Sequence, residues 1–126
     1  MLLDSHVLLW WMTDDPRLGP SARSAMASSA RPSFSAASVW ELLLKVRKGA
    51  LDLPDSFESD LLRSGLTELP VTASHARAML ALTGLDGHDP FDSLLVAQAR
   101  AERLRFLTAD RVLLGLGLPF VVDARR

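Results

Sequence analysis

The chain has 126 residues with a formal net charge of −1; 48% of them are hydrophobic and 23% are charged. A chain of this length can bury roughly two-thirds of its unfolded surface, so we expect one folded domain over residues 1–126. The absence of cysteine excludes disulfides, zinc thiolate sites and thiol catalysis. The nearly balanced charge provides no overall attraction to nucleic acid, so a nucleic-acid substrate would need a local basic patch or a metal.

Membrane association is not expected either. No apolar run approaches the roughly 20 residues that span a bilayer. The sequence starts "MLLDSH" and lacks the basic segment with which a signal peptide begins. We therefore expect a cytoplasmic protein without a membrane anchor.

The first third of the chain alternates short apolar runs with helical patterns. Residues 1–4 predict a buried strand, and residues 5–12 predict a helix with Ser5 as its N-cap. After a turn at 14–19, residues 20–29 predict a helix with Pro20 at its first position, where the missing N–H costs nothing. Residues 32–37 predict a second strand.

The middle of the chain has the clearest helix signals. Residues 38–49 predict a helix in which Ser38 and Glu41 have the spacing of a capping box, and Gly49 ends it. Residues 53–65 predict a helix capped by Asp55 and ended by Gly65. A strand at 66–71 and a helix at 72–82, capped by Thr72, are expected next.

The last third continues the alternation. Residues 89–104 predict a helix with Asp89 as N-cap and Pro90 at its first position. A strand at 105–109, a short helix at 110–114 and a strand at 119–122 complete the chain. Short strands that alternate with helices of about ten residues predict an α/β fold with a parallel sheet covered by helices.

Four carboxylates stand where a strand or small-residue run passes into a predicted helix: Asp4, Glu41, Asp92 and Asp110. The carboxyl ends of parallel strands share one edge of the sheet, and ligands bind there. Four acids at this edge would repel one another, and a hard divalent cation would relieve that repulsion. Because Mg²⁺ commonly binds one or two carboxylates together with a substrate phosphate, the pattern predicts an Mg²⁺ or Mn²⁺ site that acts on a phosphate ester.

Each acid also has a structural explanation. Asp4 could cap the helix that follows it, although Ser5 can do so equally well. Glu41 could serve only the capping box. Asp92 would occupy the same third helical position as Glu41, so that both acids face the edge of the sheet. Asp110 could be the N-cap of the short helix. A buried carboxylate without a partner is too costly to be incidental, which favours a function for Asp4.

Several neighbours are expected to support the site. Ser5, Asp89 and Thr108 would orient the ligands from outside the metal's coordination, and a direct contact of Asp89 with metal stays open. Lys45 follows Glu41 by four residues, so it could pair with that glutamate or bind a substrate phosphate.

Other motifs are absent or ambiguous. His6, His75 and His88 lack the spacing of a zinc site, although His88 could lie near the acidic site rather than in a surface loop. No phosphate-binding loop, dinucleotide fingerprint or nucleophile elbow is present. Trp10 and Trp11 are adjacent and point to different faces, which predicts that one is poorly buried and marks a dimer or partner surface.

A resemblance to a known family rests on four segments in order: "LLDSHVLLWW", "SVWELLLKVRKGALDLP", "LPVTASHA" and "HDPFDSLLVAQARAERLRFLTAD". Over essentially its whole length the chain resembles the PIN-domain toxins of VapC type from bacterial toxin–antitoxin pairs. The acidic quartet of that family falls on Asp4, Glu41, Asp92 and Asp110.

The resemblance implies a three-layer α/β/α sandwich with a mostly parallel sheet, and a homodimer. It also implies an Mg²⁺- or Mn²⁺-dependent endoribonuclease that hydrolyses RNA phosphodiester bonds with a metal-activated water. A cognate antitoxin protein is expected to block the site.

Two alternatives are less favoured. A PIN-like protein-binding module without catalysis would not need the intact acidic quartet. A phospho-accepting receiver domain has a similar length and an acidic Mg²⁺ pocket, but it needs a lysine late in the chain. The lysines here are Lys45 and Lys48.

Overall fold

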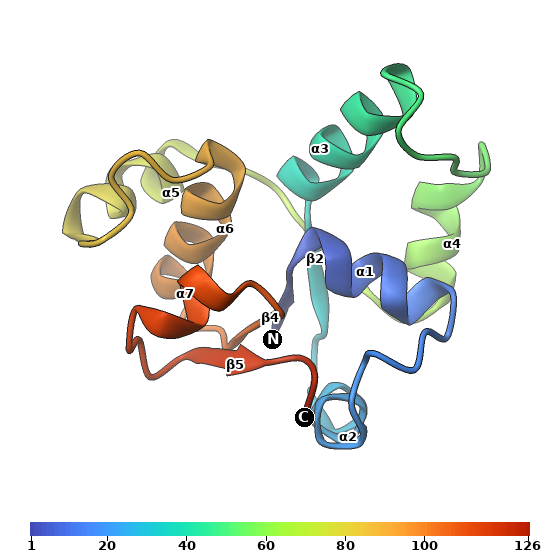
Figure 1. Ribbon diagram of the computed structural model, residues 1–126, viewed down its shortest axis with the longest axis horizontal. Coiled ribbons are helices and arrows are strands. Elements are labelled where there is room, and N and C mark those ends of the chain that lie inside the picture. The colour runs from blue at the N-terminus through green and yellow to red at the C-terminus, as the bar shows by residue number, and fades with distance from the viewer.

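Five short parallel strands form one sheet at the centre of the molecule (Figure 1). The computed structural model describes all residues from 1 to 126. The strands are β1 (Leu2–Leu3), β2 (Ser33–Ser35), β3 (Thr67–Leu69), β4 (Phe106–Thr108) and β5 (Val121–Asp123). Their order is β3-β2-β1-β4-β5, and every neighbouring pair is parallel. The chain therefore winds outward in both directions from β1, and the crevice beside β1 and β4 is where such sheets bind ligands.

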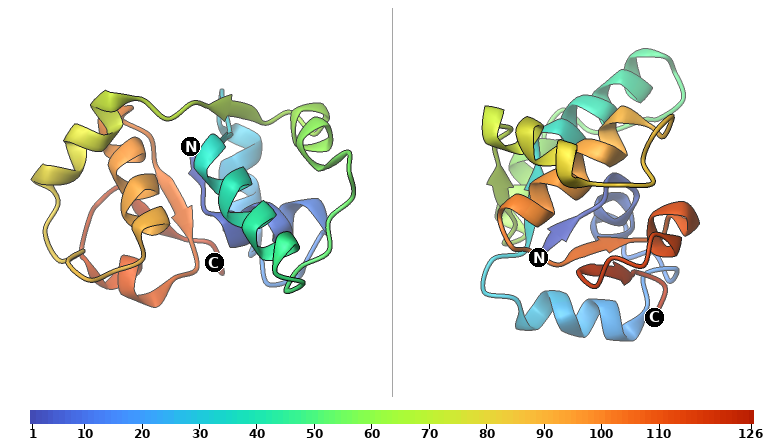
Figure 2. Two further views of the ribbon diagram at one scale, coloured as in Figure 1. Left: turned by 90° about the horizontal axis from the view of Figure 1, so that it is seen from above. Right: turned by 90° about the vertical axis from the view of Figure 1, so that its left-hand side faces the viewer.

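Seven α-helices and one 3₁₀ turn surround the sheet. They are α1 (Ser5–Met12), α2 (Pro20–Ser28), α3 (Ala36–Arg47), α4 (Phe57–Arg63), α5 (Ala73–Ala78), η1 (Met79–Ala81), α6 (Pro90–Ala101) and α7 (Arg111–Gly115). Figure 1 and the view from above in Figure 2 show α1, α3 and α4 on one side of the sheet and α5, α6 and α7 on the other. The predicted α/β/α sandwich is confirmed, and the sheet is entirely parallel. None of the helices has the length and apolar character needed to cross a membrane.

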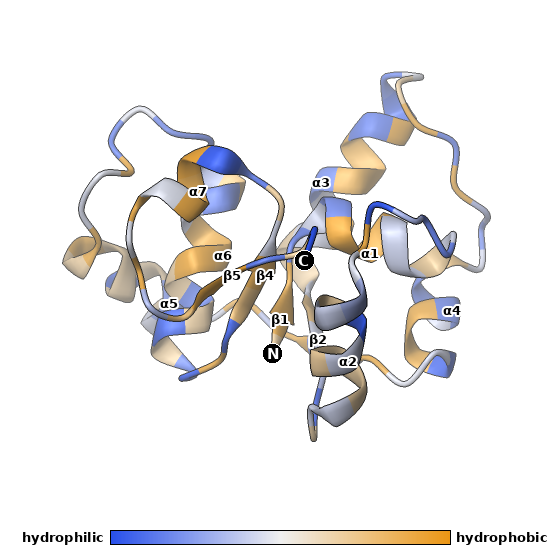
Figure 3. Cartoon of the chain, turned by 60° about the horizontal axis from the view of Figure 1, so that its bottom comes forward, coloured by the Kyte–Doolittle hydropathy of each residue, from blue (hydrophilic) through white to orange (hydrophobic).

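Alternate residues of the central strands face two separate cores. Leu3 and Leu107 pack with residues of α1, α2 and α4, whereas Leu2 and Phe106 pack with residues of α6 and α7. All four side chains are fully buried. Successive side chains of a strand point to opposite faces, so even strands of two or three residues separate the two cores. Figure 3 shows the apolar character of β1 and β4 at the centre of the molecule.

Three predicted helix starts are wrong. Asp4, not Ser5, is the N-cap of α1, and its Oδ1 accepts a hydrogen bond from the Ser5 N–H at 2.7 Å. Helix α3 begins directly after β2, with Ser35 as N-cap accepting from the Ala37 N–H at 3.0 Å. The predicted capping box of Ser38 and Glu41 is therefore absent, and Glu41 lies in the second turn of α3. Helix α4 starts after Ser56 rather than Asp55.

The other helix signals are confirmed. Pro20 opens α2, Thr72 caps α5, and Asp89 caps α6 ahead of Pro90. The glycines that end α3 and α4 have positive φ angles, 74° at Gly49 and 95° at Gly65, which a glycine adopts without a steric cost.

The predicted poorly buried tryptophan is not a member of the pair Trp10 and Trp11. Trp10 is buried, and Trp11 is half-buried with its Nε1 donating to Ser64 Oγ at 3.4 Å. The exposed tryptophan is instead Trp40 on α3, with 65% of its surface accessible.

A buried polar network connects α6 to the end of β2 and the start of α5. Gln98 is fully buried, and its Oε1 accepts a hydrogen bond from Ser35 Oγ at 2.5 Å. His75, also buried, accepts from the Thr72 N–H at its Nδ1, so its Nε2 carries the proton and faces Glu102 Oε1 at 2.7 Å. These contacts fix the position of α6 relative to the sheet, and α6 also carries Asp92.

We expect Gln98→Leu to lower the free energy of unfolding by about 1–3 kcal/mol, because the buried Ser35 hydroxyl loses its partner. Urea unfolding of Gln98→Leu, Ser35→Ala and the double variant measures the coupling. The double variant should lose clearly less than the sum of the single variants. Additive losses would show that the two side chains do not interact.

Candidate metal and catalytic site

The four predicted acids line one cavity at the carboxyl ends of the strands. The cavity measures about 450 Å³. Asp4 lies at the junction of β1 and α1, Glu41 in α3, Asp92 at the third position of α6, and Asp110 at the N-cap of α7. Asp89 and Lys45 line the same cavity. The structure therefore gathers side chains that are separated by up to 106 positions in the sequence.

Asp4 is held rigidly at the floor of the site. It is 4% exposed; its Oδ1 accepts from the Ser5 N–H, and its Oδ2 accepts from Thr108 Oγ1 at 2.6 Å. Burial raises the pKa of the Asp4 carboxyl above its usual value, although both hydrogen bonds act in the opposite direction. The Thr108 hydroxyl also accepts from the Asp110 N–H at 3.0 Å, so it contacts the loops that carry both acids. Ser5 touches Asp4 through its backbone, and the Ser5 Oγ is buried without a hydrogen-bond partner.

Asp92 carries the strongest electrostatic perturbation of the site. Burial, as the largest cause, and the negative charges of Asp4, Asp89, Glu41 and Asp110 together raise its pKa from 3.8 to about 7. Near neutral pH, the site therefore holds more carboxylates than it can keep ionised without a cation.

The Glu41 carboxylate gives a second, independent indication that the site binds a cation. Its Oε1 is shielded from solvent and has no hydrogen-bond donor. Buried carboxylate oxygens without a partner are costly, and a bound cation would remove that cost. The possible ligands that cluster here are carboxylates apart from the His88 imidazole, so the site fits a hard divalent cation such as Mg²⁺ or Mn²⁺.

Asp89 and Asp110 cap helices with one oxygen each. Asp89 Oδ1 accepts from the Phe91 N–H at 2.8 Å, and Asp110 Oδ1 accepts from the Val112 N–H at 2.8 Å. The second oxygen of each carboxylate makes no hydrogen bond and can bind an ion. Capping and metal binding are thus compatible in both residues.

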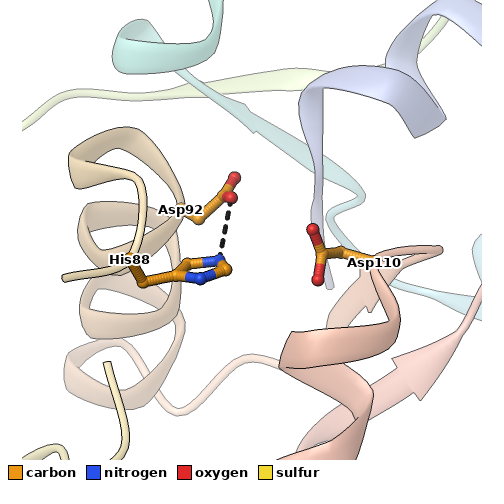
Figure 4. Close-up of side chains that lie close together, drawn as sticks. All are labelled: His88, Asp92 and Asp110. Carbon is orange, nitrogen blue, oxygen red and sulfur yellow. Dashed lines mark ion pairs between the residues drawn. The ribbon is translucent and has the colours of Figure 1, made fainter. Parts of the chain in front are cut away.

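Two groups of possible ligands share Asp92. In one, ligand atoms of Glu41, Asp89 and Asp92 lie within 4.8 Å of one another, and in the other those of His88, Asp92 and Asp110 do so (Figure 4). Asp4 belongs to neither group, and both of its oxygens already accept hydrogen bonds. A direct contact between Asp4 and the metal stays a prediction.

A basic and aromatic rim completes the cavity, and sequence reasoning did not find it. The guanidinium groups of Arg17 and Arg125 lie over the Trp10 ring, 5.0 and 5.9 Å from its centroid. Arg125 Nη1 also donates to the Ala109 carbonyl at 2.6 Å, and His6 lines the cavity too. Arg125 follows the end of β5 by two residues, so its place after a strand could have predicted that it lies at the site. Arg17 lies in a turn, and no sequence signal indicated its position.

Comparison with known proteins decides the family. A model of the PIN domain matches residues 1–116. The chain belongs to the PIN-domain family. Within this family it is 31% identical over 113 residues to Ribonuclease VapC22 of Mycobacterium tuberculosis, a match that covers 88% of this chain and 87% of that protein.

Solved structures share the PIN fold of this chain. A chain in the crystal structure of VapBC2 from Rickettsia felis, bound to a DNA fragment from their promoter, superposes with a TM-score of 0.69 at 18% identity. The match covers 97% of this PIN-domain chain and 95% of that one. A chain in the crystal structure of DNA-bound VapBC from Salmonella typhimurium gives a TM-score of 0.67 at 18% identity, covering 97% and 94%.

Asp92→Asn should stabilise the metal-free protein at high pH. Because the pKa of Asp92 is about 7 in the folded protein and near 3.8 unfolded, the folded state binds more protons, and stability falls as pH rises from about 4 to 7. The neutral variant should gain about 1–2 kcal/mol over wild type at pH 8 in EDTA, after discounting for solvent screening, and little at pH 4. Thermal unfolding at both pH values measures this, with the exposed Asp52→Asn as control. An equal effect at pH 4 and pH 8 would contradict the electrostatic explanation.

Thr108→Val should leave Asp4 Oδ2 buried without a donor and lower the free energy of unfolding by about 1–3 kcal/mol. It should also raise the pKa of Asp4 further, because the hydrogen bond that lowers it is lost. Thr108→Ser keeps the hydroxyl and should retain most of the stability. Urea unfolding compares the two variants, and a loss in Thr108→Val no larger than that in Thr108→Ser would contradict a dominant role for the hydrogen bond.

Proposed function

We propose that this PIN-domain protein is a metal-dependent endoribonuclease and the toxin of a toxin–antitoxin pair. The observation that carries the proposal is the cavity in which carboxylates from four elements converge, with a shielded Glu41 oxygen that lacks a partner. The ribonuclease name of its relative supports RNA as the substrate.

The residues divide into two groups by their chemistry. Glu41, Asp92 and Asp110 would hold Mg²⁺ or Mn²⁺, with Asp4 as a further predicted ligand. When bound, such a cation lowers the pKa of a water and stabilises negative charge on a phosphate.

The basic rim would hold the substrate. Lys45 and the two arginines over Trp10 line the same cavity as the acids, so they can contact the phosphates of an RNA strand whose scissile bond lies over the carboxylates. Arginine binds phosphate through its planar fork, which suits this position at the edge.

The alternatives fit less well. A receiver domain has the strand order 2-1-3-4-5, whereas this sheet has the order 3-2-1-4-5, so that alternative is wrong. A PIN-like module that only binds proteins would not need acids that repel one another around Asp92. The presence of this repulsion therefore disfavours a role in protein binding alone.

We also propose a cytoplasmic homodimer that binds a cognate antitoxin. The solved VapBC structures support the antitoxin partner, as does a toxin–antitoxin complex from Klebsiella pneumoniae, one chain of which superposes with a TM-score of 0.67 at 18% identity. The exposed Trp40 and Leu43 on α3 leave apolar surface available for a protein partner or a second copy.

Purified protein should cleave RNA with Mn²⁺ or Mg²⁺ and lose that activity in EDTA. Asp92→Asn, Glu41→Gln and Asp4→Asn should each reduce cleavage at least about 100-fold, because they remove charges that hold the cation. Asp52→Asn, on an exposed acid that does not line the cavity, should cleave normally. Cleavage in EDTA, or cleavage at the wild-type rate in all three site variants, would refute the assignment.

A further inference from the structure

His88 lies beside the acids, immediately before the N-cap of α6. Its backbone N–H donates to the Leu85 carbonyl at 3.0 Å, which closes a turn over residues 85–88. The imidazole turns toward Asp92, and Asp110 faces both from across the cavity (Figure 4). The His88 side chain is 18% exposed.

The side chains of His88 and Asp92 are close together but do not form a hydrogen bond. Nε2 lies 3.1 Å from Asp92 Oδ2, yet this atom is shielded from solvent and makes no hydrogen bond of acceptable geometry. An ordinary structural histidine at this depth would donate to a defined acceptor, as His75 does to Glu102. The ring is therefore placed next to the acid without completing a bond to it.

The spacing suits shared coordination. Two adjacent ligands of an octahedral ion at about 2.1 Å are about 3 Å apart, and two opposite ligands are about 4.2 Å apart. The His88 and Asp92 atoms are 3.1 Å apart, and an Asp110 oxygen lies within 4.8 Å of both. One ion can contact all three after small side-chain shifts.

We propose that His88 is a direct nitrogen ligand of the divalent cation, together with Asp92 and Asp110. This inference rests on the proposed metal site and adds a ligand outside the acidic quartet. The ring would bind through an unprotonated Nε2, with its proton on Nδ1.

A nitrogen ligand changes which metal is preferred. Mn²⁺ and Mg²⁺ both favour oxygen ligands, but Mn²⁺ as a first-row transition ion accepts an imidazole more readily than Mg²⁺ does. The site should therefore prefer Mn²⁺ over Mg²⁺ by an amount that depends on His88. If His88 only formed an ion pair with Asp92, its removal would affect both metals alike.

The test uses Mn²⁺ as a spectroscopic probe. Electron spin-echo envelope modulation of the Mn²⁺-loaded wild type should show ¹⁴N coupling from a bound imidazole, and His88→Gln should lose it. His88→Asp should still bind Mn²⁺ through oxygen but show no ¹⁴N coupling. His6→Gln is the matched control, because His6 lines the same cavity, and it should keep the coupling.

Affinities measured by calorimetry give a second readout. His88→Gln should weaken Mn²⁺ binding at least about 10-fold and Mg²⁺ binding much less, since even residues that only support a ligand cost this much when removed. Thermal unfolding without metal verifies that each variant is folded.

The possible outcomes separate the two proposals. Mn²⁺ binding without ¹⁴N coupling in the wild type, or coupling that persists in His88→Gln, would overturn the role of His88 and leave the acidic metal site intact. Failure of the wild type to bind Mn²⁺ or Mg²⁺ at all would overturn both this inference and the proposed function.

Discussion

The hydrogen bond between Thr108 and Asp4 joins the ends of the two central strands, and the site is organised around it. It is buried and 2.6 Å long, and the same hydroxyl accepts from the backbone of Asp110. β1 and β4 are the strands from which the chain winds outward in opposite directions, so their carboxyl ends border the binding crevice. A short, buried hydrogen bond to a carboxylate resists rearrangement because neither partner can turn to water instead. Asp4 and Asp110 are thereby kept close although 106 positions separate them.

Helix α6 brings Asp89 and Asp92 to the site, and hydrogen bonds near its C-terminal end fix its position. Gln98 and the neighbouring His75 connect it to β2 and α5, while Asp92 projects from its first turn into the cavity. The hydrogen bonds of the polar network thus hold α6 in a position in which Asp92, at the other end of the helix, is repelled by the neighbouring acids. Sites of this kind commonly retain unfavourable electrostatics because a ligand relieves them. The guanidinium groups of Arg17 and Arg125 lie over the Trp10 ring at the rim of the cavity, and Arg17 forms its ion pair with Asp15 rather than with an acid of the site.

Much of this could be predicted from the sequence. The strand–helix alternation gave the layers, and proline or glycine at helix ends gave most boundaries, because these signals act within a few residues. The capping box at Ser38 and Glu41 failed because β2 passes into α3 without a loop, so that Ser35 became the cap. Arg17 was not predicted, and the place of His88 stayed open between the acidic site and a surface loop, for a different reason. Their positions depend on how a turn and a loop fold back over the sheet, which no local pattern encodes.

The shortness of the strands has an evolutionary consequence. A sheet whose strands contain two or three residues requires only one or two apolar side chains per strand on each face. Such a requirement is met by many residue combinations, so lineages can replace the strand residues of the core while the backbone path persists. The acids cannot drift in this way, because each must stand at a particular strand end or helix turn. Distant members of such a family should therefore be aligned on the spacing of a few charged positions rather than on overall similarity.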